Sequence, residues 1–285
     1  MLPDFIGIGV NKAGSTWLHD LLDSHPRVWV PVKRKEVRFF TENYDLGLEW
    51  YDDFFPSDDE AGEYDAVGEI TPHYLYMNGT AERIASLGTV KRLILTLRDP
   101  VERLHSAYWF RVRVSGFEGT FEEYIRERPG EVDRGLYAKH LQTYLRHFSR
   151  DQILILIFER MIRDVPATRE TLADFLGLDV TLFPPESGTG KSNVRYVPRF
   201  RSAYQKAYRL GRSLRSHDLD WIVNGAKRFG LPAVFGKRKS PRQTQMNSDT
   251  RRRLEEIFAD DIMALEGRYG LNCSAWRSRP VKERS

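Results

Sequence analysis

The chain has 285 residues, of which 41% are hydrophobic and 12% aromatic, so it can bury the core of one large domain. Its 44 Lys and Arg residues nearly balance its 40 Asp and Glu residues, which leaves a net charge of only +4. The single cysteine, Cys273, excludes an internal disulfide framework, and no apolar stretch reaches membrane-spanning length. We therefore expect a cytoplasmic globular protein without a catalytic thiol.

Apolar, β-rich runs alternate with helical periodicities along the chain. The predicted strands are residues 5–10, 66–69, 92–97 and 152–158, and the predicted helices are residues 15–22, 81–87, 101–114, 136–147, 167–176 and 250–269. Strands that alternate with helices favour a parallel sheet covered by helices on both faces. The sequence thus predicts a three-layer α/β sandwich.

The first strand runs into a turn that is suited to an anion, in the stretch "FIGIGVNKAGSTWL" (residues 5–18). Gly14 permits close backbone approach, Ser15 and Thr16 carry hydroxyl groups, and Lys12 adds a positive charge next to a helix N-terminus. Phosphate or sulfate is the expected guest. The lysine precedes the glycine, so this turn is not a nucleotide triphosphate P-loop. Taken alone, it is equally compatible with a simple strand-to-helix connection.

A second stretch, "RLILTLRDPVERLHSAYW" (residues 92–109), places Arg98 at the carboxyl end of a strand and Ser106 two turns into a helix that begins with proline. The two side chains can converge on one anion at the same sheet edge as the first turn. The alternatives are a structural ion pair between Arg98 and Asp99 and a hydroxyl on a helix face.

Positive charge gathers in the C-terminal third of the chain. Between Lys191 and Arg253, 17 Lys or Arg residues stand against 3 Asp or Glu. The Gly-, Pro- and Ser-containing residues 183–198 predict a loop, and the three- and four-residue spacing of apolar residues from Phe200 to Leu214 predicts a basic amphipathic helix. We expect a basic helical insertion at about residues 199–240 that docks on the protein surface, with peripheral membrane contact as an alternative.

Together, "NKAGSTWL" and "LRDPVERLHSAY" resemble the sulfotransferase superfamily that uses 3′-phosphoadenosine 5′-phosphosulfate (PAPS). The stretches "KEVRFFTENYDLGLEWYDDFF", "GEITPHYLY", "GLYAKHLQTYLRHF", "QILILIFERM", "GKSNVRY" and "LEEIFADDIMALEGRYGLNCSAW" resemble its glycan-directed branch, which includes the heparan sulfate N- and O-sulfotransferases. The resemblance implies a soluble, bacterial-type member with one sulfotransferase domain over residues 1–285 and a P-loop-NTPase-like fold.

The resemblance also assigns residues to the donor. The implied contacts are Lys12, Ala13, Gly14, Ser15, Thr16 and Trp17 for the phosphosulfate, Arg98 and Ser106 for the 3′-phosphate, and Tyr137, Lys191, Ser192 and Arg195 for the rest of the nucleotide. Lys12 is expected to stabilise the bridging oxygen as the S–O bond breaks. One position departs from the pattern: some glycan sulfotransferases carry a lysine before "TP", and this chain has Ile70.

Sulfuryl transfer also needs a base for the acceptor. The resemblance places Glu36 in that role, and His73 is the alternative because a neutral imidazole can accept a proton near pH 7. Arg38, His73 and Tyr74 are expected to bind the acceptor together with Glu36. The seven histidines show no metal-ligand spacing, so no metal is expected.

The sequence therefore predicts an enzyme that moves a sulfuryl group from PAPS to a hydroxyl or amine of a carbohydrate-containing or small-molecule acceptor, with 3′-phosphoadenosine 5′-phosphate (PAP) as product. Two other classes stay open. A nucleotide or small-molecule kinase would bind ATP with magnesium, and a polyanion-binding protein would use the basic segment. No nucleic-acid partner is expected, and the sequence does not indicate an oligomeric state.

Overall fold

A computed structural model describes residues 1–189, 197–198, 237–238 and 246–277. The main sheet has five parallel strands in the order β2-β3-β1-β4-β5. Its strands are β1 (Phe5–Gly9), β2 (Val28–Trp29), β3 (Ala66–Ile70), β4 (Arg92–Leu97) and β5 (Ile153–Ile157). A separate antiparallel pair joins β6 (Val197–Pro198) to β7 (Lys237–Arg238).

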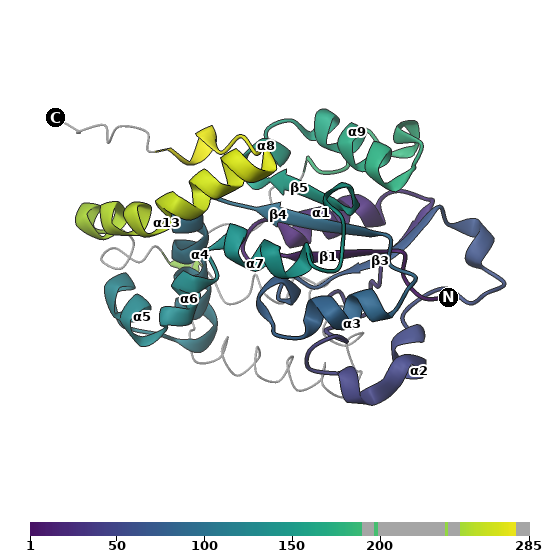
Figure 1. Ribbon diagram of the computed structural model, residues 1–285, viewed down its shortest axis with the longest axis horizontal. Coiled ribbons are helices and arrows are strands. Elements are labelled where there is room, and N and C mark those ends of the chain that lie inside the picture. The colour runs from purple at the N-terminus through teal and green to yellow at the C-terminus, as the bar shows by residue number, and fades with distance from the viewer. Residues whose placement is uncertain (190–196, 199–236, 239–245, 278–285) are drawn as a thin grey trace.

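Helices cover both faces of this sheet (Figure 1). They are α1 (Ser15–Asp23), α2 (Gly47–Asp52), α3 (Thr80–Ser86), α4 (Pro100–Ser115), α5 (Phe121–Glu127), α6 (Pro129–Asp133), α7 (Tyr137–Tyr144), α8 (Phe158–Met161), α9 (Val165–Leu176) and α13 (Ser248–Tyr269). One core cluster joins the sheet to α3, α7 and part of α13, and another joins it to α1 and α9. The predicted three-layer sandwich is confirmed.

Strand β1 is buried on both faces because it lies in the middle of the sheet. Ile6 and Ile8 face the cluster under α3 and α7, whereas Phe5 faces the cluster under α1 and α9. Its neighbour β3 packs so closely that a Cβ atom on Gly68 would come within 2.4 Å of the Phe5 carbonyl oxygen. This tight central layer fixes the carboxyl edge from which the two motif turns leave the sheet.

The four predicted strands agree with β1, β3, β4 and β5 to within a residue at each end, and each predicted helix overlaps an observed one. The two-residue strand β2 and the short helices α2, α5, α6 and α8 were not predicted, because such short elements carry little periodicity. Nearly all of the expected basic insertion at 199–240 lies outside the described residues. That insertion and the single-domain boundary stay predictions.

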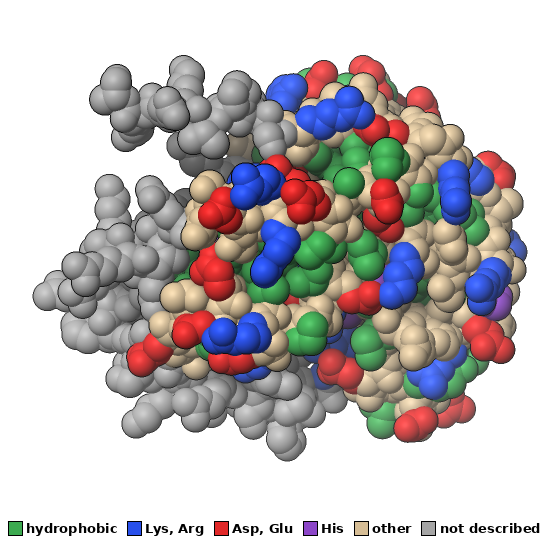
Figure 2. Space-filling view, turned by 60° about the vertical axis from the view of Figure 1, so that its left-hand side comes forward, with side chains coloured by type: hydrophobic (Ala, Val, Ile, Leu, Met, Phe, Trp, Pro, Cys, Tyr) green, Lys and Arg blue, Asp and Glu red, His purple; other side chains and the backbone are tan. Residues whose placement is uncertain are grey.

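One face of the molecule carries mixed surface charge. On the face seen in Figure 2, basic and acidic side chains are interspersed, with hydrophobic side chains between them. Among helices within the described ranges, none combines the length and the apolar character needed to cross a bilayer.

Candidate active site

The turn after β1 leaves backbone amides open at the start of α1. Gly14 is the N-cap residue with φ 88°, and no side chain caps the helix there. A Cβ atom on Gly14 would lie 2.7 Å from a ring carbon of Phe158, so both backbone angle and space require glycine. Uncapped amides at a helix N-terminus attract an anion, which fits the expected phosphosulfate.

Lys12 lies in this turn with φ 69°, a backbone angle that is uncommon outside glycine. Its ammonium nitrogen sits 3.4 Å from the ring centroid of Phe110 on α4. Burial lowers the pKa of Lys12 to about 8, and the positive charge of Arg113 adds to the shift. Lys12 is therefore mostly protonated at neutral pH, but its pKa of about 8 lies only slightly above that pH.

Arg98 follows the end of β4 and reaches across to the first turn. Its Nη1 donates to the Lys12 carbonyl oxygen at 3.1 Å, and the Tyr137 hydroxyl donates to the Arg98 carbonyl oxygen at 2.8 Å. Ser106 is half-buried on α4, one helical turn beyond Glu102, whose carboxylate lies 4.0 Å from Arg98. The structure thus brings Arg98 to the Lys12 turn. That Arg98 and Ser106 bind one anion together stays a prediction.

The remaining predicted donor residues vary in their surroundings. Ala13 is fully buried, and Trp17 is nearly so, with its Nε1 donating to the Gly188 carbonyl oxygen at 2.8 Å. Thr16 is exposed on the first turn of α1, and Ser15 beside it is half-buried. The other three predicted contacts, Lys191, Ser192 and Arg195, lie outside the described residues.

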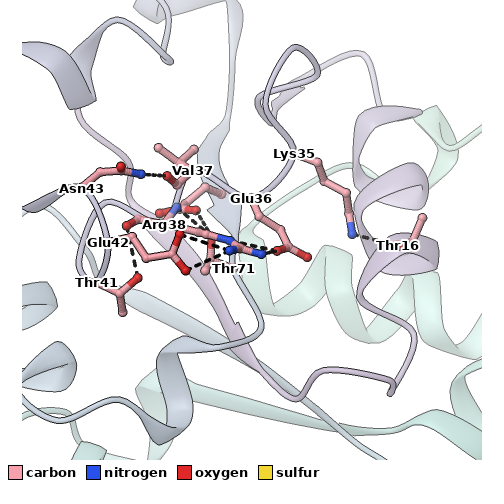
Figure 3. A network of polar contacts seen from close by, with 10 residues as sticks. Thr16, Lys35, Glu36, Val37, Arg38, Thr41, Glu42, Asn43 and Thr71 are labelled. Atoms are coloured by element: carbon pink, nitrogen blue, oxygen red, sulfur yellow. Dashed lines mark hydrogen bonds and ion pairs between the residues drawn. The ribbon is translucent and has the colours of Figure 1, made fainter. Parts of the chain in front are cut away.

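Glu36 lies in the loop of residues 35–43 (Figure 3). Arg38 donates to its carboxylate from Nη2 at 2.8 Å and also pairs with Glu42 at 2.9 Å. Burial by itself raises the pKa of Glu36, but the charge of Arg38, followed by His73 and Lys35, outweighs it and leaves that pKa below its ordinary value. Glu36 is therefore ionised at neutral pH and able to accept a proton.

His73 lies close enough to Glu36 for each to influence the other's ionisation. Burial lowers the pKa of His73, against an opposing contribution from Glu36, so the imidazole is neutral at pH 7. Its Nδ1 is buried and makes no hydrogen bond within the part of the chain that the structure describes. Both candidate bases are thus in proton-accepting form on one side of the site.

Beneath the Glu36 loop lies a buried carboxylate that the sequence analysis missed. Glu69 is 0% exposed and accepts hydrogen bonds from the hydroxyls of Thr71 at 2.7 Å, Tyr74 at 2.7 Å and Tyr51 at 3.1 Å. Thr71 in turn accepts from the Arg38 amide at 3.3 Å. Burial raises the pKa of Glu69, while these hydroxyl donors oppose part of the shift.

This arrangement corrects the expectation for Tyr74. Its side chain is 0% exposed and its hydroxyl is committed to Glu69, so no ring face is left for an acceptor sugar. The tyrosine is part of the support under the loop instead. The strand-end position misled the prediction, because aromatic residues there serve the core as readily as a ligand.

Lys35 is a second residue that the sequence analysis passed over. Its Nζ donates to the Thr16 hydroxyl at 3.0 Å, which ties the Glu36 loop to the first turn of α1. Its position directly before Glu36 was the available signal. In contrast, Ile70 is 2% exposed and packs in the cluster under α1, so that position supplies no charge to the site.

Taken together, these features describe an α/β protein with a candidate anion site at the carboxyl edge of its parallel sheet and a candidate proton acceptor, Glu36, near Lys12. Residues 2–197 match the family model "Sulfotransferase domain". The chain belongs to this sulfotransferase family.

The human "Heparan sulfate glucosamine 3-O-sulfotransferase 3B1" is 35% identical over 186 residues, covering 62% of this chain and 46% of that protein. The mouse "Bifunctional heparan sulfate N-deacetylase/N-sulfotransferase 4" is 29% identical over 214 residues, covering 66% of this chain and 24% of that protein. The chain thus spans less than half the length of these relatives.

A solved sulfotransferase from Alicyclobacillus acidocaldarius superposes with a TM-score of 0.66 at 24% identity, covering 98% of this chain and 100% of the other. This likeness shows the fold. The three-layer sandwich is the P-loop-like α/β fold of the family, as the sequence predicted.

Proposed function

We propose that the protein is an enzyme that transfers a sulfuryl group from PAPS to a hydroxyl or amine of a carbohydrate-containing acceptor. The observation that carries this proposal is the hydrogen bond from Arg98 to the Lys12 carbonyl, which joins two anion-binding elements at one sheet edge. The reaction also needs a proton acceptor, and the ionised Glu36 can serve as one. Glu36 is held near the same turn because its neighbour Lys35 donates to Thr16.

The donor would lie along this edge. Backbone amides at Gly14, Ser15 and Thr16 would hold the 5′-phosphosulfate, and Arg98 with Ser106 would hold the 3′-phosphate. The Arg98 guanidinium lies across the turn from the start of α1, so the two ends of one nucleotide can be held together. Contacts from Lys191, Ser192 and Arg195 stay predictions from the sequence.

In the reaction, the acceptor oxygen or nitrogen forms a bond to sulfur while the bond from sulfur to the bridging phosphate oxygen breaks. The electron pair of the broken bond stays on the 5′-phosphate of PAP, where Lys12 stabilises the developing charge. The acceptor proton passes to Glu36, with His73 as the alternative acceptor. The products are the sulfated acceptor and PAP, and the donor itself supplies the group that moves.

A carbohydrate acceptor is supported by the names of the relatives, which refer to heparan sulfate. Arg38 and His73 border Glu36 and would contact the acceptor next to the reacting hydroxyl. The two differ in role, because Arg38 is a permanent cation whereas His73 is neutral at pH 7. A cytoplasmic location stays a prediction from the sequence.

Two other functions were open from the sequence. A kinase is disfavoured because Lys12 lies before the glycine of the turn, where it does not match the triphosphate P-loop spacing. A polyanion binder would use the basic segment, nearly all of which lies outside the described residues. Membership of the sulfotransferase family supports the enzyme over both.

The test is isothermal titration of PAP and, separately, of ATP with magnesium into wild type and Arg98→Ala. We expect tight binding of PAP that Arg98→Ala weakens, and weaker binding of ATP. A preference of the wild type for ATP would move the kinase to first place, and no binding of either nucleotide would overturn the donor site. Transfer of labelled sulfate from PAPS to heparosan or N-sulfated heparosan then tests the acceptor class.

A further inference from the structure

The side chains of Lys35 and Arg38 leave the loop in different directions, with Glu36 between them (Figure 3). The Arg38 guanidinium pairs with the carboxylates of both Glu36 and Glu42. Lys35 instead reaches the first turn of α1, where its Nζ donates to the Thr16 hydroxyl at 3.0 Å. Its ammonium group therefore lies at the helix end that receives the donor in the proposed function.

The charge of Lys35 acts on both groups that take part in the chemistry. It lowers the pKa of Lys12 on one side and the pKa of Glu36 on the other. Lys12 also faces the positive charge of Arg113 on α4 and the negative charges of Glu36 and Glu131. Two ammonium groups thus lie near one helix N-terminus, which is unfavourable unless an anion joins them.

A bound phosphosulfate would neutralise this excess of positive charge. It carries negative charge on the sulfuryl oxygens and on the phosphate, and more develops on the bridging oxygen as the S–O bond breaks. Lys12 is one cation for that group. The buried Ile70 cannot be another, although some similar sequences carry a lysine there.

We propose that Lys35 is a second donor-contacting cation of the active site. When PAPS binds, its ammonium group donates to the sulfuryl oxygens, either in place of its contact with Thr16 or in addition to it. This inference rests on the proposed function. The contribution of Lys35 grows with the negative charge that the transition state carries. Lys35 also brings Glu36 to the donor, since the two residues are adjacent in the chain.

The variant Lys35→Met removes the charge and keeps an unbranched side chain. Lys33→Met is the matched control, because Lys33 is an exposed lysine only two residues earlier in the same segment. Lys35→Arg restores a positive charge. Two quantities are measured: the affinity for PAP, by titration, and the turnover rate of PAPS with N-sulfated heparosan as acceptor. If no glycan is sulfated, the rate is that of PAPS hydrolysis, in which water is the acceptor and inorganic sulfate is released.

For Lys35→Met we expect the turnover rate to fall by about 100- to 1000-fold, the range for loss of one preorganised electrostatic donor. Its Kd for PAP, which lacks the sulfuryl group, should change by less than about threefold, because the contact is made to the transferring group. Lys33→Met should match wild type, and Lys35→Arg should recover part of the rate. The alkaline limb of the kcat/KM profile should move to higher pH in Lys35→Met, because Lys12 loses a like-charged neighbour.

Turnover of Lys35→Met within twofold of wild type would overturn the inference. An equal loss of PAP affinity and rate would also overturn it, because Lys35 would then act in nucleotide binding or folding. If the wild type binds no PAP and turns over no PAPS, the proposed function itself fails. The two failures are therefore distinguishable.

Discussion

The two sides of the active site are built in different ways. On the proposed donor side, backbone geometry defines the turn, because Gly14 has a positive φ and no side chain caps the start of α1. On the acceptor side, the loop that carries Glu36 depends on side chains: Arg38 pairs with two carboxylates, and the buried Glu69 collects hydroxyl groups beneath it.

This difference has a functional consequence. A donor that is the same for every member of a family can be bound by a fixed turn at a sheet edge, where few residues are free to vary. An acceptor differs between enzymes, and a loop held by side chains can change its surface while the sheet stays intact. In the proposed function, donor binding would thus depend on backbone geometry and acceptor binding on side-chain support.

The largest expected effect falls on the acceptor side. Replacing the proposed base by Glu36→Gln keeps the shape of the side chain and removes its ability to accept a proton. Turnover of PAPS with the glycan acceptor should fall by about 100- to 10,000-fold, the range for general base catalysis. The measurement is the initial rate at saturating PAPS.

His73→Ala serves as the comparison variant for that experiment. A smaller loss than that of Glu36→Gln is expected, because the half-buried His73 lies beside Glu36 but does not take the proton in this account. A larger loss in His73→Ala than in Glu36→Gln would reverse the two roles.

On the donor side, Lys12→Ala should slow turnover by about 100- to 1000-fold, because it removes the charge that meets the leaving oxygen. The Kd for PAP should rise much less than the rate falls, since the backbone amides of the turn remain. Titration with PAP beside steady-state kinetics separates the two. A loss confined to PAP affinity would place Lys12 in ground-state binding.

The 3′-phosphate contact should show the opposite pattern. Arg98→Ala should raise the Kd for PAP by about 10- to 100-fold, as expected for loss of a charge-assisted hydrogen bond, and affect kcat less. Arg92→Ala is a matched control at the other end of β4, where Arg92 lies 3.8 Å from Asp4. Equal effects of the two variants would argue against a specific phosphate contact.

The smallest effect tests the support under the loop. Tyr51→Phe removes one hydroxyl donor from Glu69 and should lower the free energy of unfolding by about 1 kcal/mol, the net contribution of a typical hydrogen bond. Tyr64→Phe is the control, because the Tyr64 hydroxyl makes no hydrogen bond among the described residues; its change should stay below about 0.5 kcal/mol. Urea unfolding measures the change in unfolding free energy for both variants. Equal changes would contradict the role of Tyr51 as a support for Glu69.

The same contrast explains what the sequence could reveal. The long strands and the Lys12 and Arg98 turns were predicted, because burial periodicity and local glycine chemistry are written in consecutive residues. The Thr16 contact of Lys35 was not predicted, because it joins residues 19 positions apart in the chain. The hydrogen bonds to Glu69 were not predicted either, because they bring together a strand residue and hydroxyl groups from several elements. Tyr74 was misassigned for the same reason: its partner, not its own position, decides its role.

The most direct test of the account is a crystal structure of the protein with PAP. The account predicts the 5′-phosphate on the amides of Gly14 to Thr16 and the 3′-phosphate between Arg98 and Ser106, with Glu36 facing the position that the sulfuryl group would take. PAP bound away from the carboxyl edge of β1 and β4, or held there without Arg98 and Ser106, would contradict it.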